Sequence, residues 1–160
     1  MYSPLIFSQN QLIDTTIVEE FDNNLNEWSE WQSDENGATL TNGNYNVENK
    51  TTEGRAYWQT FQVDLKSDYS IEMKLTQTAG TDNNGYGLIW GFEDWNNYNS
   101  FLITPNKYFY IGSSEAGTAN EIQPDITNNN VKGIGEVNII KIDWMIPGKN
   151  GRYRKTWDQK

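Results

Sequence analysis

The stretch 82–113 constrains the fold more than any other part of the chain, because strand signals and turn signals alternate there at short intervals. Asn and Gly tolerate positive φ, and Pro is favoured at the second position of a β-turn. Three strands joined by short connections predict an antiparallel meander. The predicted order is a turn at 82–85, strands at 86–92, 98–103 and 108–113, a connection at 93–97 and a turn at 104–107.

The rest of the chain carries further strand signals and no convincing helical period. Residues 69–76 alternate apolar and polar side chains, as a strand with one buried face does. Residues 57–65 and 137–142 alternate in a similar way, and the turn signal Asn42-Gly43 precedes another short strand. Many short strands separated by turn residues predict an all-β domain, either a sandwich or a barrel.

The amino-acid composition supports the all-β prediction and excludes several catalytic mechanisms and metal sites. Aromatic residues, which favour strands, make up 14% of the 160 residues. The chain also holds 21 Asn and 13 Gly, which favour turns. The chain has no His and no Cys. A Ser-His-Asp triad, a Cys nucleophile, a His/Cys zinc site and disulfides are therefore excluded. Carboxylate chemistry, oxygen-ligand metal sites and binding remain.

Charge narrows the range of partners. The formal net charge is −10, and residues 1–131 contain only five Lys and Arg. Binding to nucleic acid or to an anionic membrane surface needs basic patches, so neither is expected. No segment is apolar enough to predict a membrane span. A neutral partner such as a polysaccharide is compatible with this charge.

The two ends differ from the middle of the chain. Residues 1–18 begin with a short apolar piece, which we interpret either as the remnant of a signal peptide or as a plain apolar start. Residues 19–143 form the predicted domain. Residues 144–160 form an irregular basic tail, and the last 29 residues carry +4 against −14 for the first 131. The tail is interpreted as a truncation or frameshift replacing the last strands, with a basic interaction arm and a frayed end as alternatives.

Three runs resemble the concanavalin A-like lectin and glucanase family. Residues 21–28 (FDNNLNEW) are similar to its opening strand, residues 84–101 (NGYGLIWGFEDWNNYNSF) to its central hairpin, and residues 137–142 (VNIIKI) to a later strand. The resemblance extends over about residues 19–142. The family includes laminin-G-like modules and 3-keto-disaccharide hydrolase-type modules. The closing hairpin of such members, with its Asn-Gly turn, has no counterpart after residue 142.

The resemblance implies a two-sheet antiparallel jelly-roll sandwich, incomplete at its C-terminus. It implies a non-catalytic, lectin-like carbohydrate-binding module in a secreted or surface bacterial protein, located outside the cytoplasm. A glycoside-hydrolase-like enzyme and a structural or protein-interaction module are the alternatives. The expected partner is a polysaccharide or other glycan, with no nucleic acid and no membrane insertion.

Carboxylates argue against the enzyme, because glycoside hydrolysis needs two of them flanking the scissile bond. Family-16 glucanases carry Glu-x-Asp-x-x-Glu on one strand, whereas here Glu20-Phe21-Asp22 is followed by Leu25 at the last position. Glu72 stands alone on its predicted strand, and Asp94 lies in a loop. No catalytic residue is therefore assigned.

Aromatic and amide side chains around the central hairpin form the candidate site. Sugar rings stack on aromatic faces while their hydroxyl groups need polar partners, and this part of the sequence mixes both. Core packing is the competing interpretation, and it is favoured for Trp90, whereas Trp95 is expected to be exposed. The predicted carbohydrate-binding residues are Tyr86, Trp90, Asp94, Trp95, Asn97 and Tyr98.

Calcium is a weaker candidate at the same loops. Residues 82–84 and 93–97 supply side-chain oxygens of the kind that Ca²⁺ takes, but they show no EF-hand spacing. Asn and Asp are common in turns for reasons of backbone geometry alone. Turn formation is the favoured interpretation, and no cofactor or metal is expected.

Overall fold

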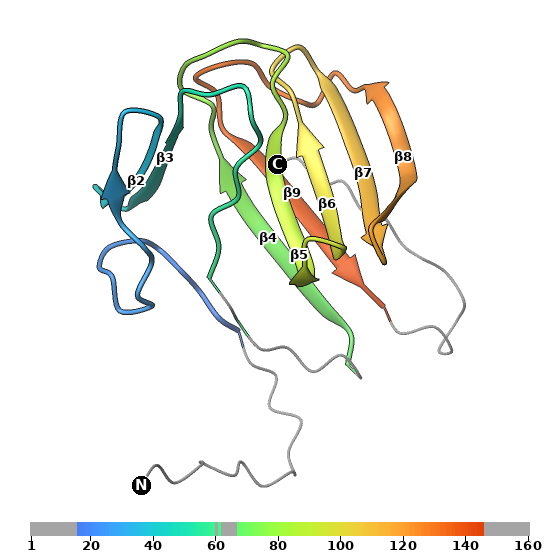
Figure 1. The fold of residues 1–160 in the computed structure, drawn as a ribbon, viewed down its shortest axis with the longest axis horizontal. Coiled ribbons are helices and arrows are strands. Elements are labelled where there is room, and N and C mark those ends of the chain that lie inside the picture. Colours follow the sequence, from blue (N-terminus) through green and yellow to red (C-terminus); the bar gives the residue numbers. More distant parts are fainter. Residues whose placement is uncertain (1–15, 60, 62–66, 146–160) are drawn as a thin grey trace, which may run out of the picture. The chain divides into compact units, whose positions relative to one another are not determined.

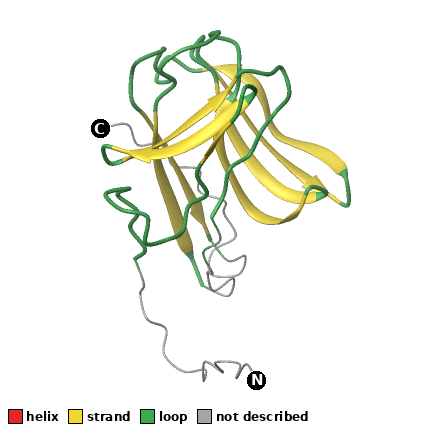
Figure 2. Ribbon diagram, turned by 60° about the vertical axis from the view of Figure 1, so that its left-hand side comes forward, coloured by secondary structure: helices red, strands yellow, loops and turns green. Residues whose placement is uncertain are grey.

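A computed structural model of the chain describes residues 16–59, 61 and 67–145. These residues form nine strands and no helix, and their paired strands are antiparallel (Figure 2). The predicted all-β fold is confirmed. Within the described part of the chain, no helix has the length and apolar character needed to cross a membrane. The chain divides into two compact units, residues 1–60 and 61–160.

The N-terminal unit contains a three-stranded antiparallel sheet in the order β1-β2-β3. The predicted turn Asn42-Gly43 joins β2 to β3, and both residues have positive φ, 52° and 67°. Two-residue hairpins of type I′ require this backbone conformation, which Asn and Gly adopt most readily. The strands are β1 (Trp31–Gln32), β2 (Asn36–Thr41) and β3 (Asn44–Asn49).

Aromatic rings and one carboxylate organise this unit. The Trp28 ring centroid lies 5.3 Å from that of Phe21 and 4.8 Å from that of Tyr45. Glu19 Oε2 accepts hydrogen bonds from Asn26 Nδ2 at 2.6 Å and from Trp28 Nε1 at 3.0 Å. The hydrogen bond from Asn26 is the main reason that the pKa of Glu19 lies below its ordinary value. Trp28 is therefore a packing residue whose indole N–H is satisfied.

The C-terminal unit contains a four-stranded sheet in the order β5-β6-β7-β8 and a two-stranded sheet, β4-β9. Figure 1 shows β5 to β8 side by side, with β4 and β9 behind them. These two layers make the unit a sandwich. The strands are β4 (Tyr69–Leu75), β5 (Tyr86–Asp94), β6 (Asn97–Ile103), β7 (Tyr108–Glu115), β8 (Thr118–Thr127) and β9 (Asn138–Trp144).

The strand boundaries differ from the predicted ones in informative places. The predicted five-residue connection at 93–97 shrinks to two residues, because β5 and β6 extend until Asp94 pairs with Asn97. A bulge between Trp90 and Asp94 allows this extension, with Gly91 at a positive φ of 59°.

The strand predicted over 57–65 and the tail predicted from residue 144 both differ from the structure or lie partly outside the described residues. Of the strand predicted over 57–65, residues 60 and 62–65 lie outside the described residues, and 57–59 form no strand. β9 continues through Trp144, which pairs with Tyr69. The predicted tail therefore does not begin at Trp144, and its remaining residues from 146 onward, like residues 1–15, lie outside the described part.

One face of the four-stranded sheet packs against β4 and β9, and we call this the inner face. Strand alternation sends Tyr86, Leu88 and Trp90 of β5 to this face together with their cross-strand partners. Met73 of β4 and Ile142 of β9 pack against the same cluster. The buried core consists of Phe101, Ile103, Phe109, Ile111, Val131 and Ile140.

Asn138 is a buried polar residue at the start of β9, only 2% exposed. Its Nδ2 donates to the Tyr86 hydroxyl at 3.0 Å and to the Lys132 carbonyl at 3.3 Å, and its Oδ1 accepts from Lys132 N at 2.9 Å. The first of these bonds joins β9 to β5, and therefore joins the two layers. Burial raises the pKa of Tyr86 despite the opposing effect of this hydrogen bond.

The close approach of the β6 backbone explains why glycine occupies position 87 in the interior of β5. A Cβ on Gly87 would overlap the carbonyl oxygen of Phe101 and lie 3.0 Å from Leu102 Cα, both on the paired strand β6. The glycine therefore permits a close approach of two backbones.

Replacing Asn138 with Ala should destabilise the C-terminal unit by about 3 kcal/mol, because backbone groups of Lys132 lose their buried partners. Thermal and urea unfolding measure this change. Asn129→Ala, at an exposed position, is the matched control and should stay within about 0.5 kcal/mol of the parent. Equal stabilities of the two variants would contradict the assigned role of Asn138.

Replacing Gly87 with Ala should cost about 3 kcal/mol of unfolding free energy, because the new methyl group collides with the β6 backbone. Gly85→Ala is the control, since a Cβ there would meet Leu102 Cβ at an ordinary 3.6 Å. Urea midpoints of the two variants make the comparison. The close-approach explanation is wrong if Gly87→Ala unfolds at the same midpoint as Gly85→Ala.

Candidate functional site

The six predicted binding residues separate into two groups. Tyr86 and Trp90 lie on the inner face and pack against the core, as the core interpretation of Trp90 predicted. The buried indole N–H of Trp90 has no hydrogen-bond partner among the described residues. Both side chains pack in the interior, because every second residue of β5 points toward β4 and β9. Asp94, Trp95, Asn97 and Tyr98 lie instead at the β5–β6 hairpin.

Asp94 and Asn97 build the hairpin turn. Asp94 Oδ1 accepts hydrogen bonds from Asn96 N at 2.7 Å and Asn97 Nδ2 at 3.1 Å. Asn97 Oδ1 in turn accepts from Ala116 N at 3.0 Å, in the neighbouring β7–β8 turn. Gly117 N donates to the Asn96 carbonyl at 3.0 Å. These bonds tie the two hairpin ends together, so the turn that carries Trp95 is held at both sides.

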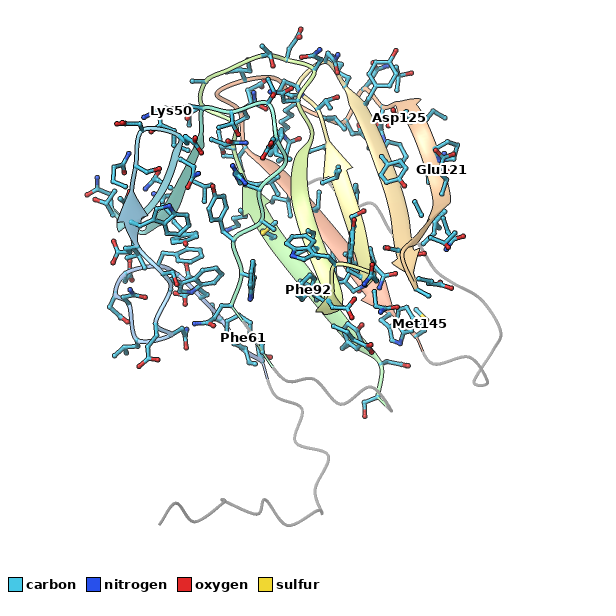
Figure 3. All side chains as sticks on the ribbon, in the orientation of Figure 1. Lys50, Phe61, Phe92, Glu121, Asp125 and Met145 are labelled. Carbon is cyan, nitrogen blue, oxygen red and sulfur yellow. The ribbon has the colours of Figure 1, made fainter. Side chains whose placement is uncertain are left out.

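Trp95 is 57% exposed and belongs to an aromatic group that we call the hairpin cluster: Phe92, Trp95 and Tyr98. The Trp95 ring centroid lies 5.1 Å from that of Phe92 and 6.1 Å from that of Tyr98, edge to face in both cases. Phe92 is itself 38% exposed and lies near the end of β5 (Figure 3). The prediction that Trp95 is exposed is confirmed. The rings do not share one plane.

The face of the four-stranded sheet turned away from the core, which we call the outer face, continues from Tyr98. Strand alternation puts Tyr98 of β6 and Tyr108 and Tyr110 of β7 on this face. The Tyr110 ring lies over Gly112, because a Cβ on Gly112 would come within 2.7 Å of Tyr110 Cε1. A glycine at this position therefore makes room for the ring.

A groove of about 270 Å³ opens on the outer face beside Tyr110. Tyr108 and Tyr110 contribute aromatic rings, and Asp125 of β8 contributes a carboxylate. Neither the Asn83 amide nor the Asp125 carboxylate forms a hydrogen bond or an ion pair with another described residue. The groove thus combines aromatic surface with available polar groups. Its lining is Asn83, Gly85, Leu102, Thr104, Tyr108, Phe109, Tyr110 and Asp125.

The Thr104 hydroxyl in this lining is already used by a turn. It donates to Asn106 Oδ1 at 2.5 Å and accepts from Tyr108 N at 3.1 Å. Lys107 N also donates to the Thr104 carbonyl at 2.8 Å, which confirms the β-turn predicted at 104–107. The turn fixes the start of β7 and therefore the position of Tyr108.

Two acidic side chains of β8 act on Tyr110. Burial raises the pKa of Tyr110 above its ordinary value, and the negative charges of Glu121 and Asp125, with the nearby Tyr98, raise it further. Glu121 and Asp125 both lie on β8 (Figure 3). Tyr98 of the hairpin cluster also contributes to the raised pKa of Tyr110, and strand alternation puts both residues on the outer face.

Carboxylate positions do not reproduce glycosidase machinery in the described residues. Glu72 lies on β4 and Asp94 at the end of β5, in different sheets. Glu121 and Asp125 both lie on β8, four residues apart, and do not repeat the Glu-x-Asp-x-x-Glu spacing of the family-16 glucanases. No group of three or more acidic residues able to hold a metal ion occurs in the described ranges.

Sequence reasoning missed the groove because it missed β8. The sequence of β8 lacks regular alternation and contains Pro124, and its pairing with β7 shifts register twice. Pro is acceptable there because β8 is the last strand of its sheet. Asp125 and Tyr110 meet only through this pairing. No pattern of adjacent residues in the sequence indicates that Asp125 and Tyr110 lie close together.

Comparisons with known protein families, curated proteins and solved structures find no significant match to the chain. The resemblance of residues 84–101 to concanavalin A-like domains therefore stays a prediction. The function is inferred from the outer face itself.

The tyrosine titration offers a direct check of this surface. Replacing Glu121 with Gln should lower the pKa of Tyr110 toward its ordinary value of about 10, because a neighbouring negative charge disfavours the phenolate. NMR of chain labelled with ¹³C-tyrosine can follow the titration, with Tyr110→Phe assigning the signal. Glu72→Gln, which removes a charge from the other layer, is the control. An unchanged Tyr110 titration in Glu121→Gln would contradict the proximity of the two groups.

Proposed function

We propose that this protein is a non-catalytic, lectin-like carbohydrate-binding module, and that the glycan lies on the outer face of β5 to β8. The observation that carries the proposal is the groove beside Tyr110, where two tyrosine rings, the Asp125 carboxylate and the Asn83 amide meet. Binding sites for small polar ligands combine apolar surface with a few well-placed polar groups. A sugar ring offers the matching chemistry, with apolar C–H faces and hydroxyl groups at its rim.

The hairpin cluster extends this surface for a longer glycan. Trp95 and Tyr98 contribute aromatic area next to the groove, and Tyr98 is close enough to Tyr110 to affect its pKa. Asp94 and Asn97 contribute mainly by fixing the turn that presents Trp95. Tyr86 and Trp90 face the core, so the proposal leaves them out of direct contact with sugar.

The proposal includes an extracytoplasmic location and a polysaccharide partner, both of which follow from the sequence resemblance. Acidic composition argues against nucleic acid as the partner. The alternative of a glycoside hydrolase is less favoured, since its paired carboxylates are not found among the residues that the structure describes.

Trp95→Ala and Tyr108→Ala should each weaken glycan binding about five-fold, which corresponds to about 1 kcal/mol of lost aromatic contact. A glycan array identifies a ligand, and isothermal titration calorimetry measures the affinities. Trp58→Ala is the control, because Trp58 is 60% exposed and belongs to the N-terminal unit rather than to β5 to β8. Folding of each variant is checked by circular dichroism. The proposal fails if the folded parent binds no glycan, or if all three variants bind like the parent.

A further inference from the structure

The groove has an electrostatic character that the proposed function does not require. Asp125 lines it, Glu121 lies on the same strand, and both act on Tyr110. No Lys or Arg belongs to the groove lining. A ligand in this groove therefore meets negative charge and no compensating positive side chain from the lining.

None of the basic residues described in the C-terminal unit belongs to the groove lining. Lys74 is on β4, in the other layer, and Lys141 on β9 forms an ion pair with Asp143 at 3.1 Å. Lys107 lies in the turn between the lining residues Thr104 and Tyr108, Lys132 lies in a loop, and both are exposed. None of the four forms an ion pair with Asp125 or Glu121. The acids of β8 therefore keep their charge available for a ligand.

We propose that the groove selects glycans that carry protonated amino groups, such as de-N-acetylated amino-sugar polymers, over acidic glycans. The inference rests on the proposed function and adds the substrate class. An ammonium group on a sugar would lie against the Asp125 carboxylate while the ring contacts Tyr108 or Tyr110. Aromatic faces also attract cations directly, by roughly 0.5–1 kcal/mol at exposed sites.

Tyr110 has two roles in this arrangement. Its ring, which lies over Gly112, forms part of the surface available to a sugar. Its hydroxyl is neutral and able to donate a hydrogen bond throughout the neutral range, because tyrosine ordinarily has a pKa of about 10 and burial raises the pKa of Tyr110 further. The charge that faces an amino sugar therefore comes from Asp125 and Glu121, and substitution of these two acids tests the proposal directly.

The experiment compares three hexasaccharides by calorimetry with the full chain: glucosamine, N-acetylglucosamine and galacturonic acid. At about pH 5.5 carboxylates are ionised and the glucosamine amines are protonated. The glucosamine hexamer should bind about ten-fold more tightly than the N-acetylated one, and the galacturonic acid hexamer more weakly than either. Added salt should weaken binding of the glucosamine hexamer most, because salt screens charge attraction.

Two charge-removing variants locate the effect. Asp125→Asn should reduce affinity for the glucosamine hexamer about five-fold, and Glu121→Gln should reduce it by a smaller factor. Glu121→Gln, which lies outside the groove lining, should leave affinity for the N-acetylated hexamer within about two-fold, whereas Asp125→Asn should reduce that affinity by a smaller factor than it reduces affinity for the glucosamine hexamer. Glu72→Gln, the same change of charge on the other layer, should alter neither.

The outcomes separate this inference from the proposed function. If both amino-sugar hexamers bind equally well and Asp125→Asn changes neither, charge selection is overturned while glycan binding stands. Charge selection is also overturned if the galacturonic acid hexamer binds best. If the folded chain binds none of the three hexamers and no glycan on the array, the proposed function fails and this inference with it. A glucosamine preference that Asp125→Asn abolishes and Glu72→Gln preserves supports the inference.

Discussion

Burial of the inner face of β5 to β7 against β4 and β9 is the constraint on which the C-terminal unit depends. Phe101, Ile103, Phe109 and Ile111 are the buried apolar residues of the four-stranded sheet in this core, and Ile140 of β9 belongs to the same buried cluster. Asn138 adds a directional contact, since its amide donates to the Tyr86 hydroxyl across the layers. Apolar burial is non-directional, whereas this hydrogen bond specifies one alignment of β9 relative to β5.

The same constraint decides which residues are available for binding. Successive side chains of a strand point to opposite faces, so committing Trp90 to the core commits its neighbours to the other side. Tyr98 and Tyr110 are therefore outward because Phe101 and Ile111 are inward. Gly112 then allows the Tyr110 ring to lie close to the sheet. The proposed glycan surface is thus the complement of the core.

Sequence patterns predicted the elements with strong local signals. The alternation of β4 and the turns at Asn42-Gly43 and 104–107 are properties of adjacent residues, and the structure confirms them. The exposure of Trp95 followed from its polar neighbours. The extension of β5 to Asp94 did not, because it depends on a bulge that only pairing with β6 stabilises. β8 was missed for a similar reason, since its two register shifts remove the alternation that prediction relies on.

The sequence by itself determined that this chain is all-β, that it lacks His and Cys chemistry, and that aromatic and amide side chains gather around the central hairpin. These are consequences of composition and of short-range periodicity. Only the tertiary structure divided the predicted site, sending Tyr86 and Trp90 inward and leaving Trp95 and Tyr98 outside. It also brought Asp125 beside Tyr110, because strand pairing joins residues that are distant in the chain, and no local pattern records which strands will pair.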